Sequence, residues 1–201
     1  MKDFNYPPQE RPYIVKLKNG AAWRGYQTAR LQISVGGERH EGEKFAATVD
    51  WVKNRFDKAV ICVNDTLQRF NYIDKGMAEK EAFDKSLEAG RLWLERHMDE
   101  LRTLPRLEIY RWEEWKGEEF RQAHERVLRL YRESAEFQQA LAESEKNNLS
   151  RDYLLEEVAV FSLMYKRENA VDIYPGTLPK VMEIFEGQHT TRIDFAKRKA
   201  A

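Results

Sequence analysis

Residues 30–35 carry the first clear pattern in the chain, because apolar and polar residues alternate along the stretch RLQISV. A repeat of two predicts a β-strand. Apolar residues then recur at helical spacing over 43–56, and the continuous apolar run KAVICV at 58–63 is typical of a buried parallel strand. Together these three segments predict a β-α-β unit.

Strand-like and helix-like segments continue to alternate downstream. The pattern next predicts a helix from about Ala78 to Leu104, which Pro105 ends, and a strand over 106–112. A charged helix follows over 117–145, and then a helix over 150–165 that Ser150 caps. The last predicted elements are a strand over 170–175, closed by Pro175, and a helix over 178–187. The long helix is expected to bury one stripe, which consists of Phe83, Leu87, Gly90, Leu94 and Leu101. This alternation predicts a single three-layer α/β domain over residues 1–201 with a mainly parallel sheet. Within it, residues 1–28 are expected to form a loosely packed lead-in, and residues 188–201 a frayed tail.

The composition fits one ordinary soluble domain and excludes several classes of protein. The chain has 201 residues, and its 34 Lys and Arg balance its 34 Asp and Glu, so any nucleic-acid contact has to come from a local basic patch. Cys62 is the one cysteine, which excludes a disulfide framework and a cysteine-based zinc site. The sequence has no run of about 18 apolar residues and no apolar signal core, so it predicts a cytoplasmic protein without a membrane segment.

Ser34 is the first candidate for chemistry. It stands at the end of the first predicted strand and is followed by Gly36 and Gly37. Ligands of open α/β sheets gather at the carboxyl ends of the strands, and glycines there let backbone N–H groups come close enough to stabilise an oxyanion. The simpler interpretation is a serine that makes only local hydrogen bonds, so position alone does not establish a nucleophile.

Several known motifs can be tested at this position. The glycines after Ser34 have the wrong spacing for a dinucleotide-binding fingerprint, and the chain lacks the Gly-Lys-Ser or Gly-Lys-Thr of a phosphate-binding loop. Gln32 replaces the first glycine of a hydrolase elbow, although the order Ser34, Asp172, His189 does match a hydrolase triad. A small serine hydrolase and a non-catalytic Rossmann-like RNA-binding module therefore stay open as alternatives.

Three motifs resemble those of one family. The first strand ends in Ile-Ser-x-Gly at 33–36, and Asp65-Thr66 follows the second strand. The stretch DYLLEEVAVF at 152–161 carries Tyr-x-x-x-Glu, and Tyr174-Pro175 stands in IYPGTLPKVMEIFEG. In this combination and order, the chain resembles the tRNA-dependent cyclodipeptide synthases over residues 28–187. Its Tyr-Pro pair is similar to the signature of the family's X-Tyr-Pro branch, whereas the other large branch has Asn at the position of Gly37.

The resemblance implies a Rossmann-like domain akin to the catalytic core of class I aminoacyl-tRNA synthetases. It also implies an enzyme that takes two aminoacyl-tRNAs and returns a cyclic dipeptide, with no metal or cofactor, because the tRNA ester is already activated. Ser34 would carry first an aminoacyl group and then a dipeptidyl group. Tyr153 and Glu157, four residues apart on a helix, would bind the α-amino group of the aminoacyl moiety, and Tyr174 would relay protons.

The resemblance further implies where the substrates bind. The walls of the amino-acid pocket would come from Gly36, Gln32, Cys62 and Val160. Aminoacyl-tRNAs are the implied partners, no protein partner is implied, and a monomer is the default expectation.

The long helix would provide the tRNA-binding face. Lys80, Arg91 and Arg102 are spaced by eleven residues, which is about three helical turns, and Arg96 lies on a second such row with Lys85. The same helix also carries many acidic residues, so an ordinary solvated face is the alternative interpretation.

Overall fold

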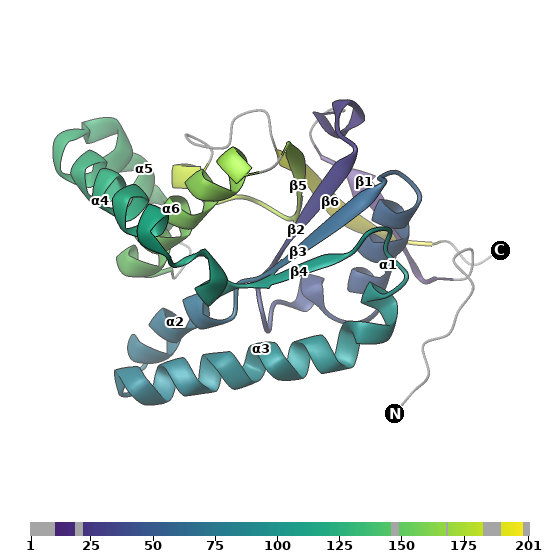
Figure 1. Ribbon diagram of the computed structural model, residues 1–201, viewed down its shortest axis with the longest axis horizontal. Helices are drawn as coiled ribbons and strands as arrows, with labels where there is room; N and C mark the ends of the chain where they lie inside the picture. Colours follow the sequence, from purple (N-terminus) through teal and green to yellow (C-terminus); the bar gives the residue numbers. More distant parts are fainter. Residues whose placement is uncertain (1–10, 19–21, 146–148, 168, 183–189, 199–201) are drawn as a thin grey trace.

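A six-stranded sheet forms the centre of the molecule. The computed structural model describes residues 11–18, 22–145, 149–167, 169–182 and 190–198. The strands are β1 (Tyr13–Leu17), β2 (Thr28–Ile33), β3 (Lys58–Val63), β4 (Glu108–Arg111), β5 (Ala170–Pro175) and β6 (Thr190–Lys197). They lie in the order β1-β6-β5-β2-β3-β4 (Figure 1). All neighbouring strands are parallel except β1 and β6, which confirms the predicted mainly parallel sheet.

The five parallel strands follow the Rossmann order. Counted along the chain from β2, they lie in the order 3-2-1-4-5, which is the order of a doubly wound nucleotide-binding sheet. The order reverses between β2 and β5, and ligands of such sheets bind at this switch point, beyond the carboxyl ends of the strands. Ser34 follows β2 directly and Tyr174 lies near the end of β5, so the fold brings both residues to the switch point.

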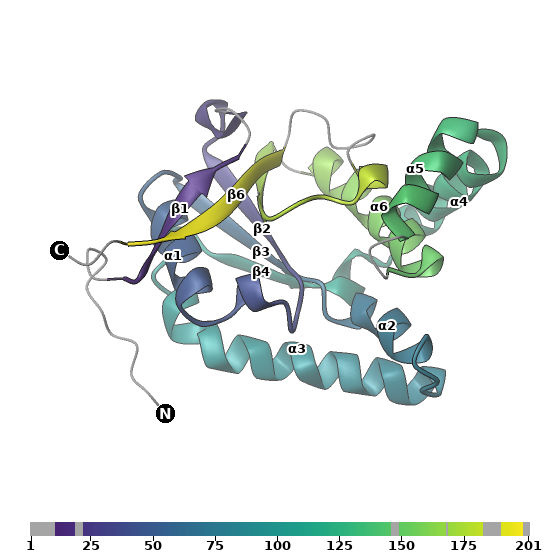
Figure 2. The same ribbon diagram turned by 180° about the vertical axis from the view of Figure 1, so that it is seen from behind.

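Helices cover both faces of the sheet (Figures 1 and 2). They are α1 (Gly42–Lys53) and α3 (Glu79–Leu101) on one face, α4 (Glu118–Glu133), α5 (Ala135–Glu145) and α6 (Arg151–Arg167) on the other, and the short α2 (Arg69–Ile73) beside α3. Single 3-10 turns span Ala22–Gly25, Glu38–His40, Thr66–Gln68 and Trp112–Trp115. Ser150 caps α6 as predicted, since its hydroxyl accepts a hydrogen bond from the Tyr153 N–H at 3.3 Å.

The two faces of β2 differ in polarity, and both are buried. Leu31 and Ile33 share an apolar cluster with Phe45 of α1. The even-numbered Arg30 and Gln32 point the other way, and both donate hydrogen bonds to Met164 of α6. The polar side of this strand therefore lies beneath the helices, whereas alternating polarity usually indicates a solvent-facing side.

The two ends of the chain contribute strands that the sequence pattern does not predict. β1 lies within the segment 1–28 and β6 within the tail 188–201, and they pair antiparallel from Tyr13 opposite Lys197 to Leu17 opposite Ile193. The predicted loose lead-in and frayed tail are therefore wrong for these residues. β1 alternates between half-buried and exposed positions at the edge of the sheet, which explains its weak apolar signal.

The charged helix predicted over 117–145 is two helices. Ser134 has an extended backbone, and its hydroxyl accepts a hydrogen bond from the Phe137 N–H at 3.2 Å, which ends α4 and caps α5. Only the beginning of the helix predicted over 178–187 falls within the described residues.

The buried stripe of α3 also differs from the prediction. Gly90 and Leu101 are buried as expected, but Leu87 is 37% exposed. The stripe instead runs through Ala82, Ser86, Gly90, Trp93, His97 and Leu101. Three small residues in this stripe let the helix pack close to the rest of the molecule, and a pattern based on large apolar residues misses them.

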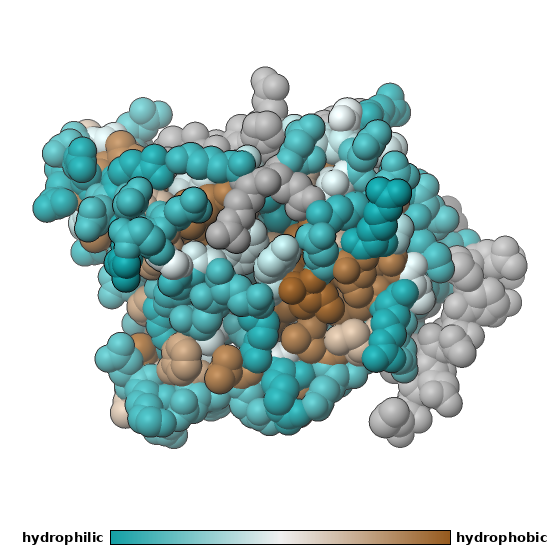
Figure 3. Space-filling model, in the orientation of Figure 1, coloured by the Kyte–Doolittle hydropathy of each residue, from teal (hydrophilic) through white to brown (hydrophobic). Residues whose placement is uncertain are grey.

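The largest apolar area on the face that Figure 1 presents lies over the sheet. In Figure 3, apolar residues gather over the β3–β4 side of the sheet, bordered by hydrophilic residues. β4 is an edge strand, and all four of its residues are half-buried. Among the described residues, no helix has both the length and the apolar character needed to cross a bilayer.

Candidate active site

Ser34 opens a tight turn directly after β2. Its carbonyl oxygen accepts a hydrogen bond from the Gly37 N–H at 3.0 Å. Gly36, the third residue of the turn, has a φ of +82°, a conformation that glycine adopts without strain. The turn holds Ser34 half-buried at the carboxyl end of its strand, at the switch point of the sheet.

Gly37 stands where a side chain would meet close neighbours. A Cβ at this position would lie 3.0 Å from the Ser34 carbonyl oxygen and 3.2 Å from Cδ2 of His40. Burial, helped by the charge of Arg39, lowers the pKa of His40 to about 4, so its imidazole is neutral near pH 7. An asparagine at position 37 would therefore crowd both Ser34 and a buried neutral ring.

The hydroxyl of Tyr153 connects the residues that were predicted to form a site. It accepts a hydrogen bond from Nε2 of Gln68 at 3.4 Å and shares another with Ser34. Burial and then the nearby Glu157 and Tyr174 raise the pKa of Tyr153 well above its ordinary value, while these two hydrogen bonds oppose the rise. The phenol therefore stays protonated, and Ser34, Glu157 and Tyr174 all lie close enough to Tyr153 to affect its pKa.

Glu157 is a buried carboxyl group with an unsatisfied oxygen. Its side chain follows Tyr153 by one helical turn, so the two share a face of α6. The residue is 4% exposed, and Oε2 has no hydrogen-bond partner among the described residues. Burial raises the pKa of Glu157 to about 8. A carboxyl in this state favours a ligand that brings its own positive charge or hydrogen-bond donor.

The neighbouring Glu156 is already paired. Arg69 donates to it from Nη1 at 2.9 Å, Trp112 donates from Nε1 at 2.7 Å, and Nζ of Lys116 lies 3.3 Å away. Burial on its own would raise the pKa of Glu156, but these partners lower it below its ordinary value. Glu156 therefore ties α6 to the start of α2, and Glu157 is the carboxyl that faces the site.

Arg30 and Asp172 form a buried ion pair below the site. The guanidinium binds the carboxylate through Nε at 2.8 Å and Nη2 at 2.7 Å, and its Nη1 donates to the Met164 carbonyl at 2.8 Å. Gln32 donates from Nε2 to Oδ1 of Asp172 at 2.9 Å. Because the amide NH₂ must face the carboxylate, Oε1 of Gln32 faces away from it, and this oxygen has no partner among the described residues.

Removing one member of this ion pair is expected to be costly. Arg30→Met should lower the free energy of unfolding by about 3–5 kcal/mol, because Asp172 would be left as a buried, uncompensated charge. The double change Arg30→Met with Asp172→Leu should recover most of this loss. Urea denaturation of both variants measures the effect. If the free energy of unfolding falls equally in the single and the double variant, the cost does not come from leaving Asp172 unpaired.

The predicted pocket residues come from three elements. Cys62 of β3 stands opposite Gln32 in the sheet register, and Val160 lies on α6. Cys62 and Val160 belong to the same buried apolar cluster. Gly36 is exposed in the turn after Ser34. Of the predicted pocket residues, Cys62 and Val160 are buried and apolar, and Gln32 adds a buried amide.

The serine hydrolase alternative loses support from the contacts of Asp172. Both carboxylate oxygens of Asp172 are bound by Arg30, which is not the environment of an aspartate that orients a catalytic histidine. The third member of that triad, His189, lies outside the described residues. In the part of the chain that the structure describes, no group of three or more His, Cys, Asp or Glu is arranged to hold a metal ion.

Asp65 has a structural role that its motif does not reveal. Its carboxylate accepts hydrogen bonds from the N–H groups of Thr66 at 2.8 Å and Trp112 at 3.3 Å, and from Nε of Arg111 at 2.6 Å. A Cβ on Gly90 would collide with the Asp65 side chain. Asp65 therefore fixes the ends of β3 and β4 and the position of α3.

Four cations of the two predicted tRNA-binding rows on α3 face a carboxylate. The pairs are Lys80 with Asp84, Arg91 with Glu88 and Glu95, Arg96 with Glu41, and Arg102 with Asp99. All four cations are exposed, and pairs that are screened by solvent in this way add little to stability. They can exchange a carboxylate for a phosphate at little cost, but they cancel much of the positive charge on this face.

Comparisons with known proteins identify the architecture. No family model and no curated protein sequence matches the chain. A cyclodipeptide synthase from Fluoribacter dumoffii superimposes on it with a TM-score of 0.82 and 23% sequence identity, over 94% of this chain and 100% of that one. This chain has the fold of the cyclodipeptide synthases.

Two further solved structures share this fold. A cyclodipeptide synthase from Candidatus Glomeribacter gigasporarum, bound to Phe-tRNAPhe, gives a TM-score of 0.66 and 19% identity over 87% of this chain and 89% of that one. A Mycobacterium tuberculosis protein gives a TM-score of 0.72 and 14% identity over 94% of both chains. Its structure relates the cyclodipeptide synthetases to the type I tRNA synthetases, which agrees with the Rossmann strand order found here.

Proposed function

We propose that the chain is a tRNA-dependent cyclodipeptide synthase of the X-Tyr-Pro branch, which joins the amino acids of two aminoacyl-tRNAs into a 2,5-diketopiperazine. The observation that carries the proposal is the hydroxyl of Tyr153, which shares a hydrogen bond with Ser34 beside Glu157 and Tyr174. Solved cyclodipeptide synthases of the same fold support it, and one of them is bound to Phe-tRNAPhe. We assign the reaction to the cytoplasm, where aminoacyl-tRNAs are made, and the scheme needs no second protein.

In the first step, Ser34 becomes acylated. Its Oγ forms a bond to the carbonyl carbon of the first aminoacyl ester, and the bond from that carbon to the ribose oxygen breaks. The serine proton ends on the released ribose hydroxyl. The hydrogen bond with Tyr153 orients the serine oxygen, and Gly36 lets the backbone approach the ester closely.

Glu157 binds the α-amino group of the aminoacyl moiety in this scheme. An ammonium supplies the positive charge and the donors that the buried carboxyl lacks, and the Tyr153 hydroxyl lies beside it. The pKa of Glu157, about 8, is close to the 7.7–8.0 or so of an α-amino group. A proton therefore moves between the two groups at little cost, which leaves the amine neutral and nucleophilic.

The balance of atoms decides which amine reacts in the second step. The amine of the Ser34-bound aminoacyl group attacks the ester of the second aminoacyl-tRNA, which releases that tRNA and leaves a dipeptidyl group on Ser34. The opposite attack, by the incoming amine on the Ser34 ester, would leave the dipeptide on the tRNA and free the enzyme. In the last step, the new terminal amine attacks the Ser34 ester, closes the ring and returns a proton to Oγ.

Tyr174 relays protons in the later steps under this proposal. It lies at the end of β5, close enough to Tyr153 to affect its pKa. Tyr174→Phe should therefore let the aminoacyl-enzyme form at nearly the normal rate and slow the release of product by roughly 10²-fold or more. Single-turnover quench experiments separate the two rates. An equal slowing of both steps would assign Tyr174 to binding instead.

Expression in bacteria tests the function as a whole. Mass spectrometry of the medium should detect cyclic dipeptides that are absent from a strain with the empty vector. Their composition reports the two amino acids, and a changed composition with Gln32→Leu would support Gln32, Cys62 and Val160 as walls of the amino-acid pocket. A folded, abundant chain that yields no cyclic dipeptide would count against the proposed function.

A further inference from the structure

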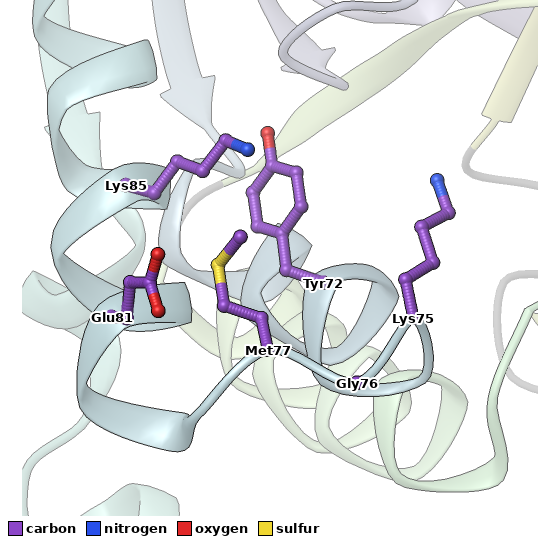
Figure 4. A pocket seen from close by; sticks show the side chains of 6 residues that line it. All are labelled: Tyr72, Lys75, Gly76, Met77, Glu81 and Lys85. Carbon is purple, nitrogen blue, oxygen red and sulfur yellow. The ribbon is translucent and has the colours of Figure 1, made fainter.

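An open pocket of about 500 Å³ lies where α2 turns into α3 (Figure 4). Its lining residues are Tyr72, Lys75, Gly76, Met77, Glu81 and Lys85. The side chains of Lys75 and Lys85 rise on either side of the Tyr72 ring, and Nζ of Lys85 lies 4.6 Å from the ring centroid. The pocket thus offers an aromatic ring and a methionine between two ammonium groups.

The two lysines differ from the other cations of this region. Within the described part of the chain, neither Lys75 nor Lys85 forms an ion pair, whereas Lys80 on the same helix is paired with Asp84. Glu81 is the one acidic residue of the lining, so two positive charges face one negative charge. The positive charge available to an anionic ligand is therefore greater in this pocket than along the paired row of α3.

The pocket is connected to the candidate active site through α2. Tyr72 follows Gln68 by four residues, which is about 6 Å along a helix. Gln68 donates to the hydroxyl of Tyr153, and its own Oε1 accepts a hydrogen bond from Asn71 at 2.7 Å. One helical turn therefore joins the aromatic ring of the pocket to the hydroxyl that contacts Ser34.

We propose that this pocket binds the single-stranded 3′ end of the aminoacyl-tRNA, with one base stacked against Tyr72 and Met77 and the flanking phosphates on Lys75 and Lys85. An aromatic platform bordered by cations is the usual way in which proteins hold single-stranded nucleic acid without reading its sequence. The 3′ end carries the ester, so it has to pass close to Ser34. This assignment rests on the proposed function and adds the place where the tRNA end is held.

Binding of deacylated tRNA to the full chain, measured by fluorescence anisotropy at several salt concentrations, tests the assignment independently of catalysis. Lys75→Gln with Lys85→Gln should weaken binding at least tenfold and reduce the slope of log affinity against log salt by about 1.4, since each single-strand phosphate contributes about 0.7. Tyr72→Leu should weaken binding roughly tenfold without changing the slope. The matched control is the double variant Lys53→Gln with Arg106→Gln. It removes two exposed charges from the segments that lead into the amino ends of β3 and β4, and it should change neither the affinity for tRNA nor the salt slope.

A tRNA shortened by its single-stranded 3′ nucleotides provides the second comparison. The wild-type chain and the pocket variants should bind it equally and weakly. Pocket variants that bind intact tRNA normally, or a wild-type chain that binds no tRNA, would overturn the assignment. Normal binding by pocket variants of a chain that still makes cyclic dipeptides would remove the pocket and leave the proposed function standing. If the pocket variants lose tRNA affinity as predicted but the wild-type chain makes no cyclic dipeptide, the pocket would stand as a tRNA site and the proposed function would fall.

Discussion

Replacement of Ser34 by alanine is expected to lower the production of cyclic dipeptide by at least about 10³-fold, because no other group in the scheme can hold the acyl intermediate. The loss should be complete for the covalent intermediate, since the variant has no oxygen to acylate. The fold should be unaffected, because the turn depends on the carbonyl oxygen of residue 34 and on Gly36 rather than on the hydroxyl. Product and intermediate are both measured with purified protein and labelled aminoacyl-tRNA.

Ser162→Ala is a matched control on α6. The Ser162 hydroxyl donates to the Ala159 carbonyl at 2.7 Å, so its loss removes only a contact within the helix. This variant should keep full activity. A Ser34→Ala chain that still forms product at more than a small fraction of the normal rate would show that the route is not covalent.

Replacement of Glu157 by glutamine is expected to stabilise the folded chain at alkaline pH. The folded pKa, about 8, lies above the ordinary 4.5, so the native state holds a proton that the unfolded state releases between these values. Stability of the wild type therefore falls as the pH rises from about 4.5 to about 8, by about 1.4 kcal/mol for each pH unit. Glutamine does not titrate, so the variant should gain up to about 5 kcal/mol over the wild type by pH 8, a difference that is absent near pH 4.

Urea denaturation of both chains from pH 4 to pH 9 measures this difference. Glu125→Gln, an exposed glutamate of α4, is the control and should follow the wild type at every pH. If the curves of the Glu157 variant and the wild type stay parallel, the carboxyl of Glu157 is not held in a costly environment.

The same variant should lose function while it gains stability. Without a carboxylate, the α-ammonium of the aminoacyl group loses a charge-assisted contact, and kcat/KM for aminoacylation of Ser34 should fall by about 10- to 100-fold. A residue that lowers the stability of the free protein and strengthens binding is expected at a functional site. An unchanged kcat/KM would remove Glu157 from the substrate site.

The parts of the fold with strong apolar periodicity could be predicted from the sequence. The β-α-β unit from β2 to β3, the strand β4 and the capped helix α6 lie close to their predicted positions. β1 and β6 were missed because their residues are partly exposed at one side of the sheet, so neither shows a clear pattern. The break at Ser134 was missed because its capping hydroxyl gives no apolar signal.

Sequence motifs indicate the reactive residues of the site. The contacts around these residues join distant segments of the chain, and only the structure shows them. The position of Ser34 and the family resemblance together indicate Ser34, Tyr153, Glu157 and Tyr174, and in the structure Ser34, Glu157 and Tyr174 all lie close enough to Tyr153 to affect its pKa. The pairing of Arg30 with Asp172 joins residues 142 positions apart, and no local pattern indicates it. For the same reason, the contact of Gln68 with Tyr153 and the pairing of Glu156 with Arg69 could not be read from the sequence.

Intact-protein mass spectrometry after mixing the purified chain with one aminoacyl-tRNA tests directly whether Ser34 carries the acyl group. A rapid mass increase equal to one aminoacyl group is expected. Peptide mapping should place the added group on Ser34, and a second aminoacyl-tRNA should convert it into a cyclic dipeptide. Product formed without any adduct, or an adduct on another residue that turns over at the rate of product formation, would show that Ser34 does not carry the intermediate.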